Sequence, residues 1–149
     1  MMNGKTIRLD HGLIVLSFIL GVFLSANAFA QTRDVIEVSY YRIKGGHKAE
    51  WLSLYKKNHL PILQAHQQAG LITRIEIFEI AFHEIEPGWD YQVVMRMKDW
   101  AAFDEMGKRE EEVRKRLYPN KEQFEKEENR RWEITERHWD EVIRPVKMD

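Results

Sequence analysis

The first thirty residues constrain the fold most, because they resemble an export signal and leave residues 31–149 to fold. Lys5 and Arg8 give this segment a charged start, and residues 12–24 form an almost uninterrupted apolar run. That run is about 13 residues long, whereas crossing a bilayer takes about 20. A retained membrane anchor is the alternative, but the short run favours a signal peptide over residues 1–30.

The end of this segment has the pattern of a cleavage site. Ala28 and Ala30 place small residues at the −3 and −1 positions before Gln31, as signal peptidase substrates do. We therefore predict cleavage after Ala30 and a periplasmic or secreted protein with no membrane span after the signal is removed.

Composition excludes several classes of function. The chain has 23 basic and 24 acidic side chains, a net charge of −1, and nucleic-acid binding would require a basic surplus. It has no cysteine, which excludes disulfides, thiol catalysis and thiolate metal sites. A small exported domain without disulfides needs a good core or oligomerisation to be stable.

Residues 31–149 read as one α+β domain. A strand at 35–44 ends at the turn signal Gly45-Gly46, and apolar residues then recur every three or four positions up to Ala69. Pro61 interrupts this helix, so we expect a kink or break at Leu60. The remaining predicted elements are a strand at 71–84, a strand at 89–98, a helix from Trp100, and a last helix from Asn120 to about Ile143.

The C-terminal part is predicted as a charged helical extension over residues 119–149. Pro119 divides it from the preceding helix, and Asn120 with Gln123 has the spacing of a capping pair. The charged block 125–131 is expected to be a solvated helix face. The order is then β-α-β-β-α-α, and a fourth strand is either short and near 143–148 or absent.

The first strand has apolar residues on both of its faces. Ile36 and Val38 lie on one face, whereas Tyr41 and Ile43 lie on the other. A sheet covered by helices on one side and by a partner on the other would require this pattern. We therefore predict a homodimer joined through the face of the sheet that the helices leave open.

The chain resembles the dimeric α+β barrel superfamily, with a ferredoxin-like β-α-β-β-α core. The matching pieces are Tyr41 to His47 followed by Trp51 to Tyr55, then Asn58 to Pro61, the strands at 74–82 and 91–97, and Trp100 with Phe103. The pattern is similar to antibiotic-biosynthesis monooxygenase-like and NIPSNAP-like proteins. This resemblance implies two four-stranded sheets that meet in a homodimer and a ligand cleft between each sheet and its helices.

The cleft that the resemblance implies directs attention to the inward face of the first helix. His59 is the candidate catalytic base, because histidine exchanges protons near neutral pH. The candidate ligand-binding residues are Tyr41, Trp51, Tyr55, Asn58 and His66. Glu37 shares a strand face with Tyr41 and could project into the same cleft. The alternatives are that both histidines are buried structural residues, that Trp51 and Tyr55 belong to the core, and that Glu37 faces solvent.

No metal site is predicted. His59 and His66 are about 10 Å apart along a straight helix, too far to chelate one ion together, and no H-E-x-x-H motif is present. No resident cofactor is predicted either, but haem remains an alternative because one histidine suffices as its axial ligand.

Three functions remain open. The first is an exported protein that binds a small apolar or aromatic molecule, for which the resemblance implies a cofactor-independent oxygenase or an isomerase. The second is a non-catalytic binding or interaction protein. The third is a haem-binding protein that uses His59 or His66.

Overall fold

The computed structural model describes residues 34–81 and 88–146. The predicted signal peptide and the end of the predicted second strand lie outside these residues. The elements in chain order are β1 (Val35–Ile43), α2 (Lys48–Leu54), the π-helical turn η1 (Tyr55–His59), α3 (Leu60–Gln68), β2 (Ile72–Glu79), β3 (Tyr91–Met97), α4 (Trp100–Leu117), α5 (Lys121–Glu133) and β4 (Thr135–Ile143).

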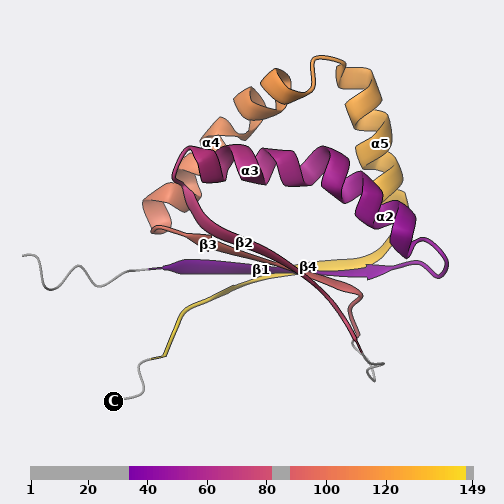
Figure 1. Cartoon of the computed structure of the whole chain (residues 1–149), viewed down its shortest axis with the longest axis horizontal. Helices are drawn as coiled ribbons and strands as arrows, with labels where there is room; N and C mark the ends of the chain where they lie inside the picture. The colour runs from indigo at the N-terminus through magenta and orange to yellow at the C-terminus, as the bar shows by residue number, and fades with distance from the viewer. Residues whose placement is uncertain (1–33, 82–87, 147–149) are drawn as a thin grey trace, which may run out of the picture. The chain divides into compact units, whose positions relative to one another are not determined.

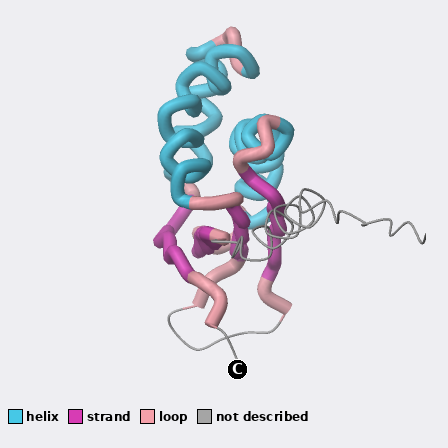
Figure 2. The backbone as a smooth tube through the Cα atoms, turned by 90° about the vertical axis from the view of Figure 1, so that its left-hand side faces the viewer, coloured by secondary structure: helices cyan, strands magenta, loops and turns pink. Residues whose placement is uncertain are grey.

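The four strands form one sheet in the order β2-β3-β1-β4, and each neighbouring pair is antiparallel. Figures 1 and 2 show the described helices on one side of this sheet. The β-α-β-β-α-β succession, with α5 added before the last strand, is the ferredoxin-like arrangement. The predicted α+β ferredoxin-like class is therefore confirmed.

The predicted last helix is wrong beyond residue 133. Helix α5 ends at Glu133, and residues 135–143 form β4, which pairs with β1 along its length. Thr135, Trp139 and Val142 fit a helical stripe by their spacing, so the local pattern was ambiguous. A strand forms here because the edge of β1 supplies hydrogen-bond partners for the backbone of residues 135–143. Tyr40 of β1 also stacks on Trp139, with ring centroids 4.8 Å apart. Thus the C-terminal extension is helical only in its first half.

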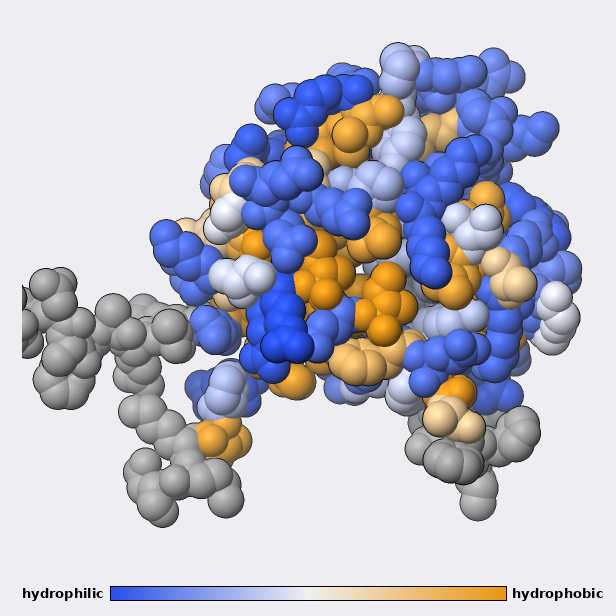
Figure 3. All heavy atoms as spheres, viewed as in Figure 1, coloured by the Kyte–Doolittle hydropathy of each residue, from blue (hydrophilic) through white to orange (hydrophobic). Residues whose placement is uncertain are grey.

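Side chains alternate across β1 as the sequence predicted. Tyr41 and Ile43 pack in the main core beneath the helices. Ile36 and Val38 point to the opposite face, since successive Cβ atoms in a strand alternate, and they are buried as well. Space-filling Figure 3 shows hydrophobic side chains gathered in the middle of one face, among hydrophilic ones.

The first helix passes through Pro61 without a break. Leu60 is helical, with φ −55° and ψ −40°, and its N–H donates to the carbonyl of Tyr55 in a π-type bond. Pro61 has no N–H to donate to the preceding turn. The hydroxyl of Tyr118 instead shares its one hydrogen between the carbonyl oxygens of Lys57 and Asn58, at 2.9 and 2.8 Å. A π-helical turn therefore takes the place of the predicted kink.

Local stop and start signals set the ends of several elements. Gly46 and Gly70 have positive φ angles of 83° and 73°, which other residues rarely adopt. The Asp99 side chain accepts a hydrogen bond from the Ala102 N–H at 2.8 Å and so caps α4. The Asn120 side chain caps α5 in the same way, through the N–H of Gln123 at 3.1 Å.

Candidate functional site

A cleft of about 240 Å³ lies between α3, α4 and the sheet. One wall is a face of the first helix, with residues spaced at i, i+3, i+4 and i+7: His59, Ile62, Leu63 and His66. The opposite wall is a face of α4 with the same spacing: Phe103, Met106, Gly107 and Glu110. Glu37 of β1 and Met95 of β3 line the cleft from the sheet. The cleft is thus mainly apolar, with four titratable side chains.

His59 lies where the π-helical turn meets α3. Its ring contacts the ring of Tyr55, with centroids 5.1 Å apart, and its side chain is half-buried because part of it faces the cleft. Burial, followed by the positive charge of Arg131 and by His138, lowers the pKa of His59 to about 4. The imidazole is therefore neutral at pH 7, and it accepts or donates hydrogen bonds without carrying charge.

Glu37 brings a carboxyl group to the same cleft, as its shared strand face with Tyr41 suggested. Burial raises the pKa of Glu37, and the nearby carboxylate of Asp140 raises it further. A carboxyl with a raised pKa and a neutral imidazole in an apolar cleft are two groups that can exchange protons with a bound molecule.

His66 lies in the same cleft with one ring nitrogen unused. Its side chain is 2% exposed, and Nδ1 has no hydrogen-bond partner within the described part of the chain. Burial lowers the pKa of His66, so its ring is neutral at pH 7. A buried polar atom without a partner is costly in a folded protein, and here the atom belongs to a side chain that lines the cleft.

The predicted aromatic ligand residues lie behind the cleft instead of lining it. The Trp51 side chain is fully buried and stacks on Tyr55 and Tyr91, with centroids 5.0 and 5.2 Å away, while Tyr41 lies 4.7 Å from it. The Trp51 indole N–H donates to Thr135 Oγ1 at 2.9 Å. Their predicted part in ligand binding stays untested, but their observed contacts are those of core residues.

Asn58 is also outside the lining of the cleft. Its side-chain N–H₂ donates to Glu127 of α5 at 3.0 Å, and Glu127 accepts from Lys57 at 2.6 Å. These bonds tie the π-helical turn to α5. Asn58 therefore holds the segment that carries His59, and a direct contact with a ligand stays a prediction.

Arg131 is the charged residue that the sequence interpretation missed. It is 1% exposed, although its block was expected to be a solvated face. Its guanidinium lies 5.8 Å from the ring centroid of Trp51, 5.7 Å from that of Tyr55 and 4.6 Å from that of Trp132. Nη2 donates to Glu128 at 2.7 Å. One buried arginine within a block of mixed charges leaves no distinct mark in the sequence.

The α4 wall was also missed, although Phe103, Met106, Gly107 and Glu110 have the regular spacing of one helix face. That signal was present but was read as part of a charged helix. Within residues 34–81 and 88–146, no three His, Asp or Glu side chains lie close enough together to hold a metal ion. In the same residues, no helix has the length and apolar character needed to cross a membrane.

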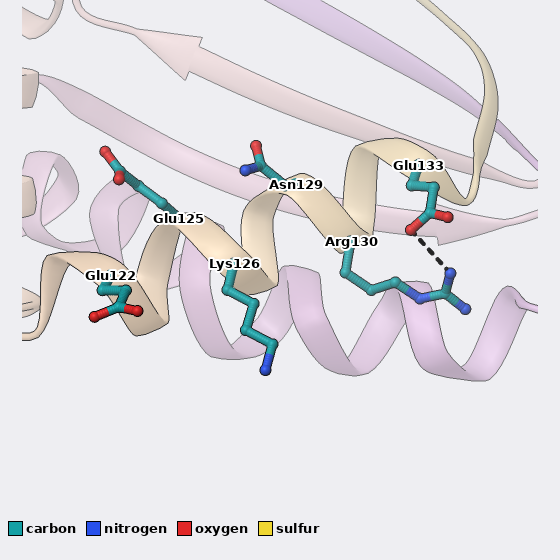
Figure 4. Close-up of a pocket in the computed structure, with 6 residues that line it drawn as sticks. All are labelled: Glu122, Glu125, Lys126, Asn129, Arg130 and Glu133. Atoms are coloured by element: carbon teal, nitrogen blue, oxygen red, sulfur yellow. Dashed lines mark hydrogen bonds and ion pairs between the residues drawn. The ribbon is translucent and has the colours of Figure 1, made fainter.

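A second hollow lies on α5, but it is a poor candidate site. The six residues that line it all belong to this one helix: Glu122, Glu125, Lys126, Asn129, Arg130 and Glu133. Figure 4 shows their polar side chains along the helix, with Arg130 donating to Glu133 at 3.1 Å. Arg130 also donates to Glu50 at 2.8 Å. This face is a solvated, ion-paired helix surface of the predicted kind.

The depressed pKa of His59 predicts a pH dependence of stability. An unfolded histidine has a pKa of about 6.5, so between pH 6.5 and about 4 the unfolded chain binds a proton that the folded chain excludes. The contribution of His59 to the free energy of unfolding should therefore be fully present above about pH 6.5. It should fall between there and pH 4, by up to about 3 kcal/mol. His59→Gln should flatten this slope in urea unfolding, whereas Gln64→Ala, at an exposed position with no titrating group, should leave it. Equal slopes for His59→Gln and the wild-type protein would contradict the lowered pKa of His59.

Comparison with known proteins gives a fold and no more. No protein-family model matches the sequence, and no curated protein matches it. The structure is similar to those of two NIPSNAP family proteins from Agrobacterium tumefaciens. One is 16% identical with a TM-score of 0.50, covering 77% of this chain and 95% of that one. The other, of unknown function, is 15% identical with a TM-score of 0.50, covering 80% and 94%.

A third similar structure is a dimeric ferredoxin-like protein from an uncultured marine organism. It is 7% identical with a TM-score of 0.53, and the match covers 80% of this chain and 94% of that one. Each likeness spans nearly the whole of the compared protein. The resemblance seen in the sequence is therefore confirmed at the level of architecture: this chain has the ferredoxin-like α+β fold found in NIPSNAP family proteins.

Proposed function

We propose that this protein is an exported homodimer that binds a small, largely apolar or aromatic molecule in the cleft between α3, α4 and the sheet. The observation that carries the proposal is the cleft itself, where Glu37, His59 and His66 meet among apolar side chains. Ligand sites commonly combine mostly apolar walls with a few polar groups that fix orientation.

The chemistry that suits this cleft is proton transfer. A cofactor-independent oxygenase that deprotonates its substrate and an isomerase that shifts a proton both begin by removing a proton from the substrate. The neutral His59 is a weak base, because the pKa of its conjugate acid is about 4. The pKa of Glu37 is raised toward the range where a carboxylate is an effective base. Glu37 is therefore the better proton acceptor, and His59 hydrogen-bonds and orients the substrate beside it.

Dimerisation through the face of the sheet opposite the helices is part of the proposal. Phe78, Val94 and Ile143 lie on that face by their strand register. Phe78 and Ile143 keep 44% and 46% of their surface exposed. Exposed apolar side chains on one face favour burial of that face against a second copy of the chain. Val94→Arg should then yield monomers, whereas Glu122→Arg on the outer surface of α5 should not.

Haem is a weaker occupant than a small molecule. The cleft volume of about 240 Å³ falls below the roughly 300–1,000 Å³ that drug-sized ligands occupy, and a haem macrocycle is larger still. A non-catalytic binding protein remains the second candidate, because the same cleft would serve binding without turnover.

The test is native mass spectrometry of the protein purified from the envelope of its own organism. We expect a dimer of chains that begin at Gln31, each carrying one small molecule. That molecule, isolated and returned to the protein in D₂O, should exchange a proton for deuterium with the wild-type protein and much more slowly with Glu37→Gln. A monomer without a bound molecule would contradict the binding proposal. Deuterium exchange at an equal rate with Glu37→Gln would contradict proton transfer by Glu37 and favour the non-catalytic binding protein.

A further inference from the structure

We propose that Gly107 forms the entrance of the cleft and that His66 selects the ligand, which is a flat, uncharged molecule of about two fused rings with one hydroxyl group. This inference rests on the proposed small-molecule function of the same cleft. It adds the shape of the ligand, its polar group and the two residues that recognise them.

A side chain at Gly107 would have open space around its first carbon. Gly107 lies near the middle of α4, where glycine is less favourable than alanine. A Cβ atom added at Gly107 would meet nothing within 4 Å, and its φ angle is not in the positive region. Gly107 is exposed and lines the cleft. Neither backbone geometry nor close packing requires glycine here, so the missing side chain serves to leave the entrance open.

His66 gives the cleft a polar group that the described part of the chain leaves without a hydrogen bond. Nδ1 is buried and has no hydrogen-bond partner among the described residues. In a neutral ring this nitrogen is either a donor or an acceptor, depending on the tautomer. A hydroxyl group satisfies both tautomers, because it donates one hydrogen bond and accepts others. Rotation of the ring about its Cβ–Cγ bond would bring this nitrogen to the cleft, where a ligand hydroxyl would remove the cost of the unpaired atom.

Charge and volume limit the rest of the ligand. Glu37 and Glu110 line the cleft, and no lysine or arginine among residues 34–81 and 88–146 does, so an anionic ligand would be repelled. An apolar cavity of about 150 Å³ engineered in another protein holds benzene, so about 240 Å³ leaves room for a second fused ring. The backbone of α4 at Gly107 allows a flat ring edge to pass close to the helix.

The test uses three probes of nearly equal size: 2-naphthol, naphthalene and 2-naphthoate. Equilibrium dialysis at pH 7.5 with the intact chain from residue 31 should show 2-naphthol binding about tenfold more tightly than either of the others. Gly107→Leu should weaken binding of 2-naphthol by about tenfold or more, because the side chain closes the entrance. Lys108→Leu, one position further on the same helix and outside the cleft, should bind within about twofold of the wild-type protein.

His66→Leu, a change of similar volume, should bind 2-naphthol and naphthalene equally. Thermal melting of Gly107→Leu and His66→Leu should stay close to that of the wild-type protein, which separates a blocked cleft from an unfolded chain. Unchanged 2-naphthol binding in Gly107→Leu would contradict the proposal that Gly107 forms the entrance. A retained preference for 2-naphthol over naphthalene in His66→Leu would contradict the proposal that His66 selects the hydroxyl group. Absence of binding to the wild-type protein would overturn the ligand class, while a bare protein in native mass spectrometry would overturn the function on which it rests.

Discussion

Replacing Trp51 with alanine should lower the free energy of unfolding by about 3–5 kcal/mol, the usual cost of truncating a buried tryptophan. The indole is fully buried. It stacks on Tyr55 and Tyr91 and donates a hydrogen bond to Thr135. Alanine would leave a cavity between the first helix and the sheet and would leave the start of β4 without its hydrogen-bond donor. Urea unfolding followed by far-UV circular dichroism measures the loss.

Trp100→Ala is the matched control for this change. Trp100 is 56% exposed at the start of α4, so its truncation should cost less than about 1 kcal/mol. A stable Trp51→Ala protein with much weaker ligand binding would return Trp51 to the ligand-binding role that the sequence suggested. A large loss of stability would identify it as a core residue.

Replacing Arg131 with alanine should cost about 3–5 kcal/mol, because the change leaves the carboxylate of Glu128 largely buried without its partner. The same change removes the guanidinium from the faces of Trp51, Tyr55 and Trp132. It should also raise the pKa of His59, since the charge of Arg131 helps to hold that pKa low. Urea unfolding measures the first effect, and an NMR titration of the His59 ring measures the second.

The neighbouring residue provides the control. Arg130 pairs with Glu50 and Glu133 at the exposed surface of α5, and such ion pairs contribute about 0–1 kcal/mol. Arg130→Ala should therefore change stability little and leave the His59 titration unchanged. The double change Arg131→Met with Glu128→Leu should recover much of the lost stability, because apolar pairs often replace buried ion pairs without loss. No recovery would mean that Arg131 has contacts beyond its charge pair.

Much of the fold could be predicted because its signals are local. Gly46 and Gly70 end segments through their own backbone freedom, and Asp99 and Asn120 cap the helices that follow them. Alternation along β1 predicted two covered faces for the same reason, since a strand exposes neighbouring side chains to opposite sides.

The candidate site was predicted only in part. His59, His66 and Glu37 do line one cleft, because helix and strand periodicity places residues on shared faces. The α4 wall that completes the cleft comes from a segment about forty positions further along the chain, and its approach to α3 depends on packing across the sheet.

The sequence by itself determined the β-α-β-β-α order of the first part of the domain, its turns and caps, and the helix face that carries the two histidines. Only the tertiary structure decided that residues 135–143 form a strand, that Arg131 is buried and that Pro61 is absorbed in a π-helical turn. Each of these depends on a partner distant in the chain: the edge of β1, the rings of Trp51 and Tyr55, and the hydroxyl of Tyr118. Local propensity is a weak preference that such long-range contacts override.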